Sequence, residues 1–69
     1  MPVAPHVERL IIERRDLAIR MDKLKAFIGT DTFNTLPVEE QVDMRYQLLI
    51  MDVYSDILGR RITRVTTSW

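Results

Sequence analysis

The chain has 69 residues and a mass of 8.1 kDa, and its ten basic residues balance its ten acidic residues to a formal net charge of zero. This length allows one domain, which we place over residues 1–69, and the absence of cysteine together with a single histidine excludes disulfides, thiolate metal sites and multi-histidine metal sites. The balanced charge argues against duplex nucleic acid as the main partner, because proteins that bind it usually carry a broad basic face.

The first predicted element is a helix over residues 5–28. Pro5 suits its first turn, where the missing N–H has no helical partner to lose, and Gly29 is placed to be a left-handed residue just past its end. Arg14 interrupts the apolar stripe. The stripe recurs at intervals of three and four residues and comprises Val7, Leu10, Leu17, Met21, Leu24 and Ile28.

The connector "GTDTFNTLP" predicts one short helical turn from Asp31, with Phe33 and Leu36 as apolar plugs. Pro37 is expected to begin a second helix over residues 37–63 or slightly beyond. Because the connector is short, the two long helices should fold back on each other as an antiparallel hairpin. The expected core stripe of the second helix is Met44, Leu48, Met51, Leu58, Ile62 and Val65.

Each long helix also carries a second apolar face. A lone hairpin buries one face of each helix, and a chain of this size without disulfides or metal gains barely enough from burial to offset its conformational entropy. We therefore expect an all-α fold in which antiparallel two-helix hairpins assemble into a homo-oligomeric helical bundle. The second faces comprise Ile12, Ile19 and Ala26 on the first helix and Val42, Tyr46, Leu49, Ile50, Val53 and Ile57 on the second.

Charge is distributed unevenly along the chain. Residues 26–44 hold four acids and no base, whereas residues 59–69 hold three arginines and no acid and end in the single tryptophan, Trp69. The hairpin should bring Arg9, Arg14 and Arg15 of the first helix beside Arg60, Arg61 and Arg64 of the second. Arg60 and Arg64 share a helix face, which continues the second apolar face, while Arg9 and Lys23 flank the Ile12/Ile19 stripe. A guanidinium offers a planar fork for phosphate and a flat surface for bases, so a compact polyanion is the expected ligand.

The same residues also fit a purely structural interpretation. Arginines in a last helical turn interact favourably with the helix dipole and can simply be solvated. Lys23 is equally compatible with a solvated side chain, and His6 with a surface or capping residue. The sequence has no glycine-rich phosphate loop, no nucleophile with a base and no carboxylate pair of metal-binding type, so we expect a binding protein, not an enzyme, without metal or cofactor.

The order of motifs from residue 6 to residue 62 resembles a known family. The segments "HVERLIIERRDLAIRMDKLKAFI" and "DTFNTLPVEEQVDMRYQLLIMDVYSDILGRRI" carry an E-R pair early in the first helix, K-L-x-A-F-I at its end, the connector T-x-x-F-x-x-L-P-x-E-E-Q, and Y-x-x-x-L-x-x-R-I late in the second helix. This pattern resembles the phage anti-CBASS protein two family, whose helical hairpin is also found in a Thoeris anti-defence sponge.

The resemblance implies a homohexamer that binds cyclic di- and trinucleotides made by bacterial immune synthases. The protein would hold them without cleavage and so inhibit CBASS-type defence. It further implies an aromatic residue near the N-terminus and a basic residue late in the first helix for cyclic dinucleotides, with arginines late in the second helix for another ligand class. Near the position expected for the aromatic residue this chain has His6, which is a departure from the family pattern. Lys23 is the candidate for the basic residue, with Lys25 as the near alternative. Arg60 and Arg64 match the family's arginines late in the second helix.

The expected location is the host cell cytoplasm. No apolar run approaches the roughly 20 residues of a membrane span, and the first residues lack the basic-then-apolar order of a secretion signal, so no membrane partner is expected. Two other functions remain open. One is a structural or protein-interaction helical-bundle phage protein without a nucleotide ligand, and the other is a small nucleic-acid-binding regulator, which the balanced charge disfavours.

Overall fold

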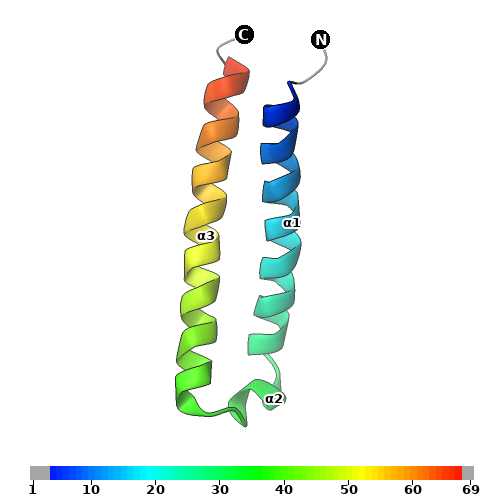
Figure 1. The fold of residues 1–69 in the computed structure, drawn as a ribbon. Coiled ribbons are helices and arrows are strands. Elements are labelled where there is room, and N and C mark those ends of the chain that lie inside the picture. The colour runs from blue at the N-terminus through cyan, green and yellow to red at the C-terminus, as the bar shows by residue number, and fades with distance from the viewer. Residues whose placement is uncertain (1–3, 68–69) are drawn as a thin grey trace.

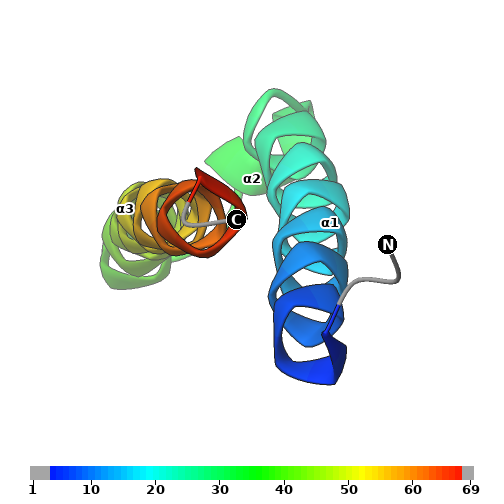
Figure 2. The same cartoon turned by 90° about the horizontal axis from the view of Figure 1, so that it is seen from above.

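The computed structural model describes residues 4–67, which form three helices: α1 (Pro5–Ile28), α2 (Asp31–Asn34) and α3 (Val38–Thr67). The two long helices lie side by side with opposite directions, and α2 sits at the turn between them (Figure 1). Viewed from above, α1 slants across the direction of α3 (Figure 2). The result is a rod of 50 × 16 × 14 Å. The predicted all-helical class and the packing of the two long helices are confirmed, while Trp69 lies outside the described residues.

Helix α1 has the bounds that the sequence predicts, but the expected left-handed glycine at its end is wrong. Gly29 has φ −81° and ψ 2°, and no residue in the described range has a positive φ. The Gly29 N–H still makes an α-helical bond to the Lys25 carbonyl, at 3.2 Å. The turn tightens at the next residue, where the Thr30 N–H donates to the Phe27 carbonyl at 3.0 Å. Because this narrower turn leads directly into α2, no reversal of backbone handedness is needed.

The turn end is closed by the predicted short helix. Thr30 caps α2, since its Oγ1 accepts the Phe33 N–H at 3.3 Å and donates to the Phe27 carbonyl at 2.6 Å. Phe33 is fully buried, stands edge-on to Phe27 with ring centroids 6.2 Å apart, and has the Arg45 Cζ 5.1 Å from its ring centroid. The apolar plug predicted at Phe33 therefore seals one end of the hairpin.

Helix α3 begins one residue later than predicted, and it extends past residue 63 to Thr67, as the sequence allows. Pro37 precedes the helix, and its carbonyl accepts the Gln41 N–H at 3.1 Å. At the other end, the hydroxyls of Thr63 and Thr66 donate to the carbonyls of Gly59 and Ile62 at 2.9 and 2.8 Å. These threonines thus fit a helical backbone, and the predicted core stripe continues to Val65, which is half-buried.

A single apolar layer between α1 and α3 forms most of the core. Leu17, Met21 and Leu58 are buried at its centre, with Leu10, Leu48 and Met51 packed against them. The second apolar face of α3 points outward: Ile50 is 62% exposed and Leu49 58% exposed, and Ile12 and Ile19 on α1 are also exposed. None of the helices in residues 4–67 has an apolar stretch long enough to cross a membrane.

Candidate functional site

An open groove lies at the end of the rod where α1 begins and α3 ends. It encloses about 540 Å³, and we call it the arginine groove. This volume falls in the range of pockets that hold small ligands. Its lining comes from both long helices and consists of Arg14 from α1 and Asp56, Gly59, Arg60, Thr63 and Arg64 from α3.

The α3 side of the groove follows from helical spacing. Asp56, Arg60 and Arg64 recur every four residues, so they lie on one face, with Gly59 and Thr63 on the adjoining row. Antiparallel packing then adds Arg14 from the facing helix. The groove therefore holds three guanidinium groups and one carboxylate.

Among the described residues, ion pairs do not compensate the charges of Arg14 and Arg60 in this groove. Arg20 pairs with Glu13 at 3.5 Å, and within residues 4–67 neither Arg14 nor Arg60 takes part in an ion pair. Asp56 borders the groove without pairing with either of them. Exposed like charges gathered in a concave site attract an anion and favour its binding there.

Because Gly59 has no side chain, the guanidinium group of Arg14 packs directly against α3. A Cβ atom built on Gly59 would lie 2.8 Å from both Cζ and Nη2 of Arg14 and 3.0 Å from Nη1. The Arg14 Nε–H also donates a long hydrogen bond, 3.5 Å, to Ser55 Oγ. The guanidinium thus occupies the space that any other residue at position 59 would fill. A second depression, of about 500 Å³, borders Arg14 and is lined by Ile11, Arg15, Ala18, Ser55 and Ile62 as well.

The sequence predicts that Arg14 interrupts the core stripe and lies beside Arg60 and Arg64, but it assigns neither Arg14 nor Gly59 to the ligand site. Two signals were available: a lone charged residue within an apolar stripe, and the only glycine inside the second helix. What links them is their juxtaposition across the helix pair, which the sequence does not show.

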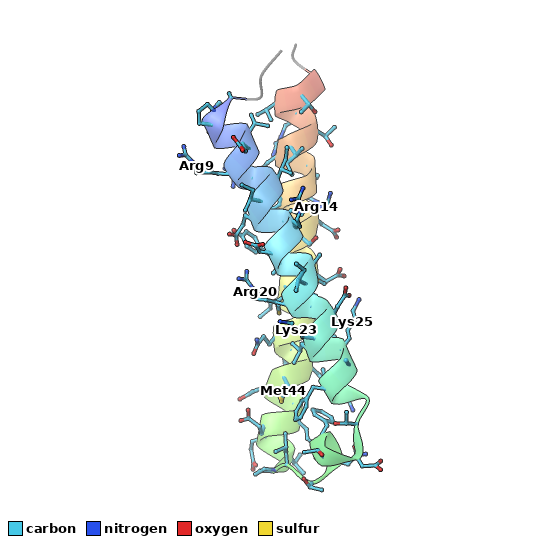
Figure 3. All side chains as sticks on the ribbon, turned by 90° about the vertical axis from the view of Figure 1, so that its right-hand side faces the viewer. Arg9, Arg14, Arg20, Lys23, Lys25 and Met44 are labelled. Carbon is cyan, nitrogen blue, oxygen red and sulfur yellow. The ribbon has the colours of Figure 1, made fainter. Side chains whose placement is uncertain are left out.

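The structure brings together two of the five sequence-predicted ligand residues. Arg60 and Arg64 both line the arginine groove, whereas His6, Arg9 and Lys23 are exposed on α1 and do not line it. Figure 3 shows Arg9 and Arg20 projecting from one side of α1 and Arg14 and Lys25 projecting from the other.

Lys23 is also far from the groove along the rod. Arg14 lies against Gly59, and Met21 shares a depression with Asp52, so Lys23 is level with about Ile50. Ten residues separate Ile50 from Arg60, which corresponds to about 15 Å of helix. Within one chain, therefore, Lys23 and Arg60 do not face the same small ligand.

Metal binding finds no support in the side-chain arrangement. In the part of the chain that the structure describes, no group of three or more His, Asp or Glu residues could hold a metal ion. The groove combines guanidinium groups, a hydroxyl and a carboxylate, which suits recognition of an anion through hydrogen bonds.

The fold and this groove define a helical-hairpin protein with an arginine-lined groove toward one end. The chain belongs to the Sequestin family, whose model matches residues 4–64. The family name suggests a sequestering protein and is compatible with a sponge. No curated protein and no solved structure matches the chain. Membership in the anti-CBASS protein two family stays a prediction.

Proposed function

We propose that this protein is a phage-encoded sponge that binds cyclic di- and trinucleotides without cleaving them. Acting in the host cell cytoplasm, it keeps these signals from their effectors and so inhibits CBASS-type defence. The observation that carries the proposal is the groove toward one end of the hairpin in which Arg60 and Arg64 lie on the same face of α3, with Arg60 outside any ion pair in the described range. Membership in the Sequestin family supports the sequestering role.

A cyclic dinucleotide matches the chemistry of this groove. Its ring carries two phosphodiester charges and two flat bases. A guanidinium group can donate two parallel hydrogen bonds to a phosphate, and its flat face can stack on a base. A hydrogen bond to a charged group contributes about 1.5–3 kcal/mol, so one such bond from each of Arg60 and Arg64 supplies about 3–6 kcal/mol. Micromolar binding requires about 8 kcal/mol, so the ligand needs further contacts beyond these two side chains.

Self-assembly is the proposed source of those contacts. Arg60 and Arg64 lie on the face of α3 that carries Val53 and Ile57, which are exposed in the single hairpin. A neighbouring copy that covers this apolar face would also wall the groove. We propose a homohexamer, in which His6, Arg9 and Lys23 contact ligand between copies, away from the arginine groove of their own chain.

The first test is a ligand panel on the full chain. Cyclic di-AMP, cyclic di-GMP, cyclic GMP–AMP and cyclic tri-AMP are added separately, and thermal stability is measured. A ligand at 100 times its Kd stabilises the folded state by about 2.7 kcal/mol, which is a readily measured shift for a protein of this size. A panel with no shift would contradict the proposed function.

Residue assignment is tested by the double variant Arg60→Ala/Arg64→Ala. We expect it to lose the shift while helicity is retained, because both side chains are exposed in the hairpin, and while oligomer mass is retained, because the apolar side chains of the same face are unchanged. Arg61→Ala is the matched control, because it removes an arginine from the same end of α3 and Arg61 does not line the groove. Nucleotide released by heating should be recovered intact, and recovery of a linear product would show an enzyme instead.

The exposed apolar face of α3 also favours a second candidate, a structural or protein-interaction protein of the phage with no nucleotide ligand. The same panel separates the two. A stable oligomer that no cyclic nucleotide stabilises would support the structural role.

A further inference from the structure

We infer that Arg14 is a third ligand-binding arginine and that Gly59 is the positioning residue that seats its guanidinium in the arginine groove. This inference rests on the proposed function and deepens it, because it names a contact that helical spacing within α3 could not reveal. It also explains a glycine in the interior of a long helix, where that residue type is among the least favourable.

The distances indicate how the guanidinium lies. Its Cζ and both terminal nitrogens are 2.8–3.0 Å from the Cβ position of Gly59. Because these three atoms are almost equally far from the Cβ position, the guanidinium packs its flat face on α3. A guanidinium that met α3 edge-on would have its terminal nitrogens clearly closer to this position than Cζ. The N–H groups of a guanidinium lie in its plane, so in this orientation they point along the surface of α3.

The terminal donors remain available for a ligand. Arg14 uses Nε–H for the bond to Ser55, and within residues 4–67 its Nη1 and Nη2 have no hydrogen-bond or ion-pair partner. The side chain is exposed and borders the same groove as Arg60. A guanidinium already held against Gly59 and Ser55 loses less freedom on binding phosphate than a freely moving arginine does.

A purely structural role for Arg14 makes a different prediction. If the Arg14–Gly59 contact served only to pack the hairpin, then disturbing it would lower stability and leave the intrinsic affinity for ligand unchanged. If Gly59 seats a ligand-binding group, then adding a methyl group should lower affinity without lowering stability. The steric conflict falls on the far end of a flexible side chain, which can swing away at little cost.

The experiment measures ligand affinity by calorimetry and stability by thermal unfolding, with the same four cyclic nucleotides as probes. Gly59→Ala should keep or raise the melting temperature and weaken binding of the best probe by about tenfold, the loss of one charged hydrogen bond. Arg14→Met, which keeps the apolar stem, should weaken binding at least as much. Arg14→Lys, which keeps the charge but not the fork, should recover only part of the affinity.

A double-mutant cycle shows whether Gly59 acts through Arg14. In the Arg14→Met background, Gly59→Ala should cause no further loss of affinity. Gly29→Ala is the matched control, because a Cβ there meets only carbonyl oxygens at 3.6–3.7 Å and lies at the far end of the rod. That variant should bind as the wild type does.

The outcomes separate this inference from the proposed function. If Arg60→Ala/Arg64→Ala abolishes binding while Arg14→Met and Gly59→Ala bind normally, the proposed function stands and the role of Arg14 is overturned. If Gly59→Ala lowers the melting temperature and leaves affinity unchanged, the contact is structural and the inference fails. If the wild type binds none of the probes, both proposals are overturned together.

Discussion

The substitution Ile50→Asp tests whether the outward face of α3 is an interface between copies. Ile50 is 62% exposed in the single hairpin, so replacing it disturbs little of the contact between α1 and α3. If a second copy covers this face, the new carboxylate is instead buried at an apolar junction. The same substitution is therefore mild for a monomer and severe for an oligomer.

The magnitude follows from the exposed fraction. Full burial of an isoleucine side chain contributes about 1.5–3 kcal/mol, so covering the exposed 62% of Ile50 contributes about 1–2 kcal/mol per chain. Leaving an unpaired carboxylate in the interface costs several kcal/mol more. A combined loss of about 4 kcal/mol lowers the association constant of each contact by about a thousandfold.

Sedimentation equilibrium or light scattering measures the effect as a mass. We expect the wild type to form a stable oligomer and Ile50→Asp to shift to the mass of a single chain at the same concentration. Gln47→Asp is the control, since it adds the same charge at an exposed position of α3 that lies outside the apolar stripe. A wild type that sediments as a single 8.1 kDa chain, or an Ile50→Asp variant with undiminished mass, would refute the reasoning.

Two further predictions concern stability, measured by urea unfolding. Gly29→Ala should stabilise the protein by about 0.4–1 kcal/mol, because φ −81° suits alanine and the added methyl group meets no close neighbour; a clear loss would indicate that the left-handed glycine expected from the sequence was right after all. Leu58→Ala should cost about 2–5 kcal/mol, because this side chain is 1% exposed at the centre of the core. Leu49→Ala, at a position 58% exposed, should cost less per chain and act mainly on assembly, and equal losses at the two sites would contradict the core described above.

Local signals predicted the helical elements because they depend on nearby residues. The apolar periodicity of α1, the turn chemistry around Asp31 and the buried position of Phe33 all appear in the structure. The error lies at the end of α1, where Gly29 stays in the right-handed region because Thr30 begins the next cap at once. Helix α3 runs past residue 63, as the sequence allows, and the hydroxyl of Thr63 donates within the helix to the Gly59 carbonyl.

The candidate site was predictable in detail only where it lies on one helix, although the hairpin also predicts that Arg14 lies beside Arg60 and Arg64. Arg60 and Arg64 are four residues apart, so their shared face follows from the geometry of a helix alone. Arg14 is 45 residues from Gly59 along the chain, and the register between α1 and α3 decides that the two meet. The same register places Lys23 level with Ile50, which removes Lys23 from the groove of its own chain.

The sequence by itself determined the two long helices, their apolar faces and the separation of acids from arginines, because each of these follows from residue type and a period of 3.6. Only the tertiary structure decided that Arg14 shares a groove with Arg60 and Arg64, and why a glycine stands inside α3. Those outcomes depend on the register and the relative rotation of the two packed helices. The contact between Arg14 and Gly59 joins residues of two different helices, so no pattern within either helix alone specifies it.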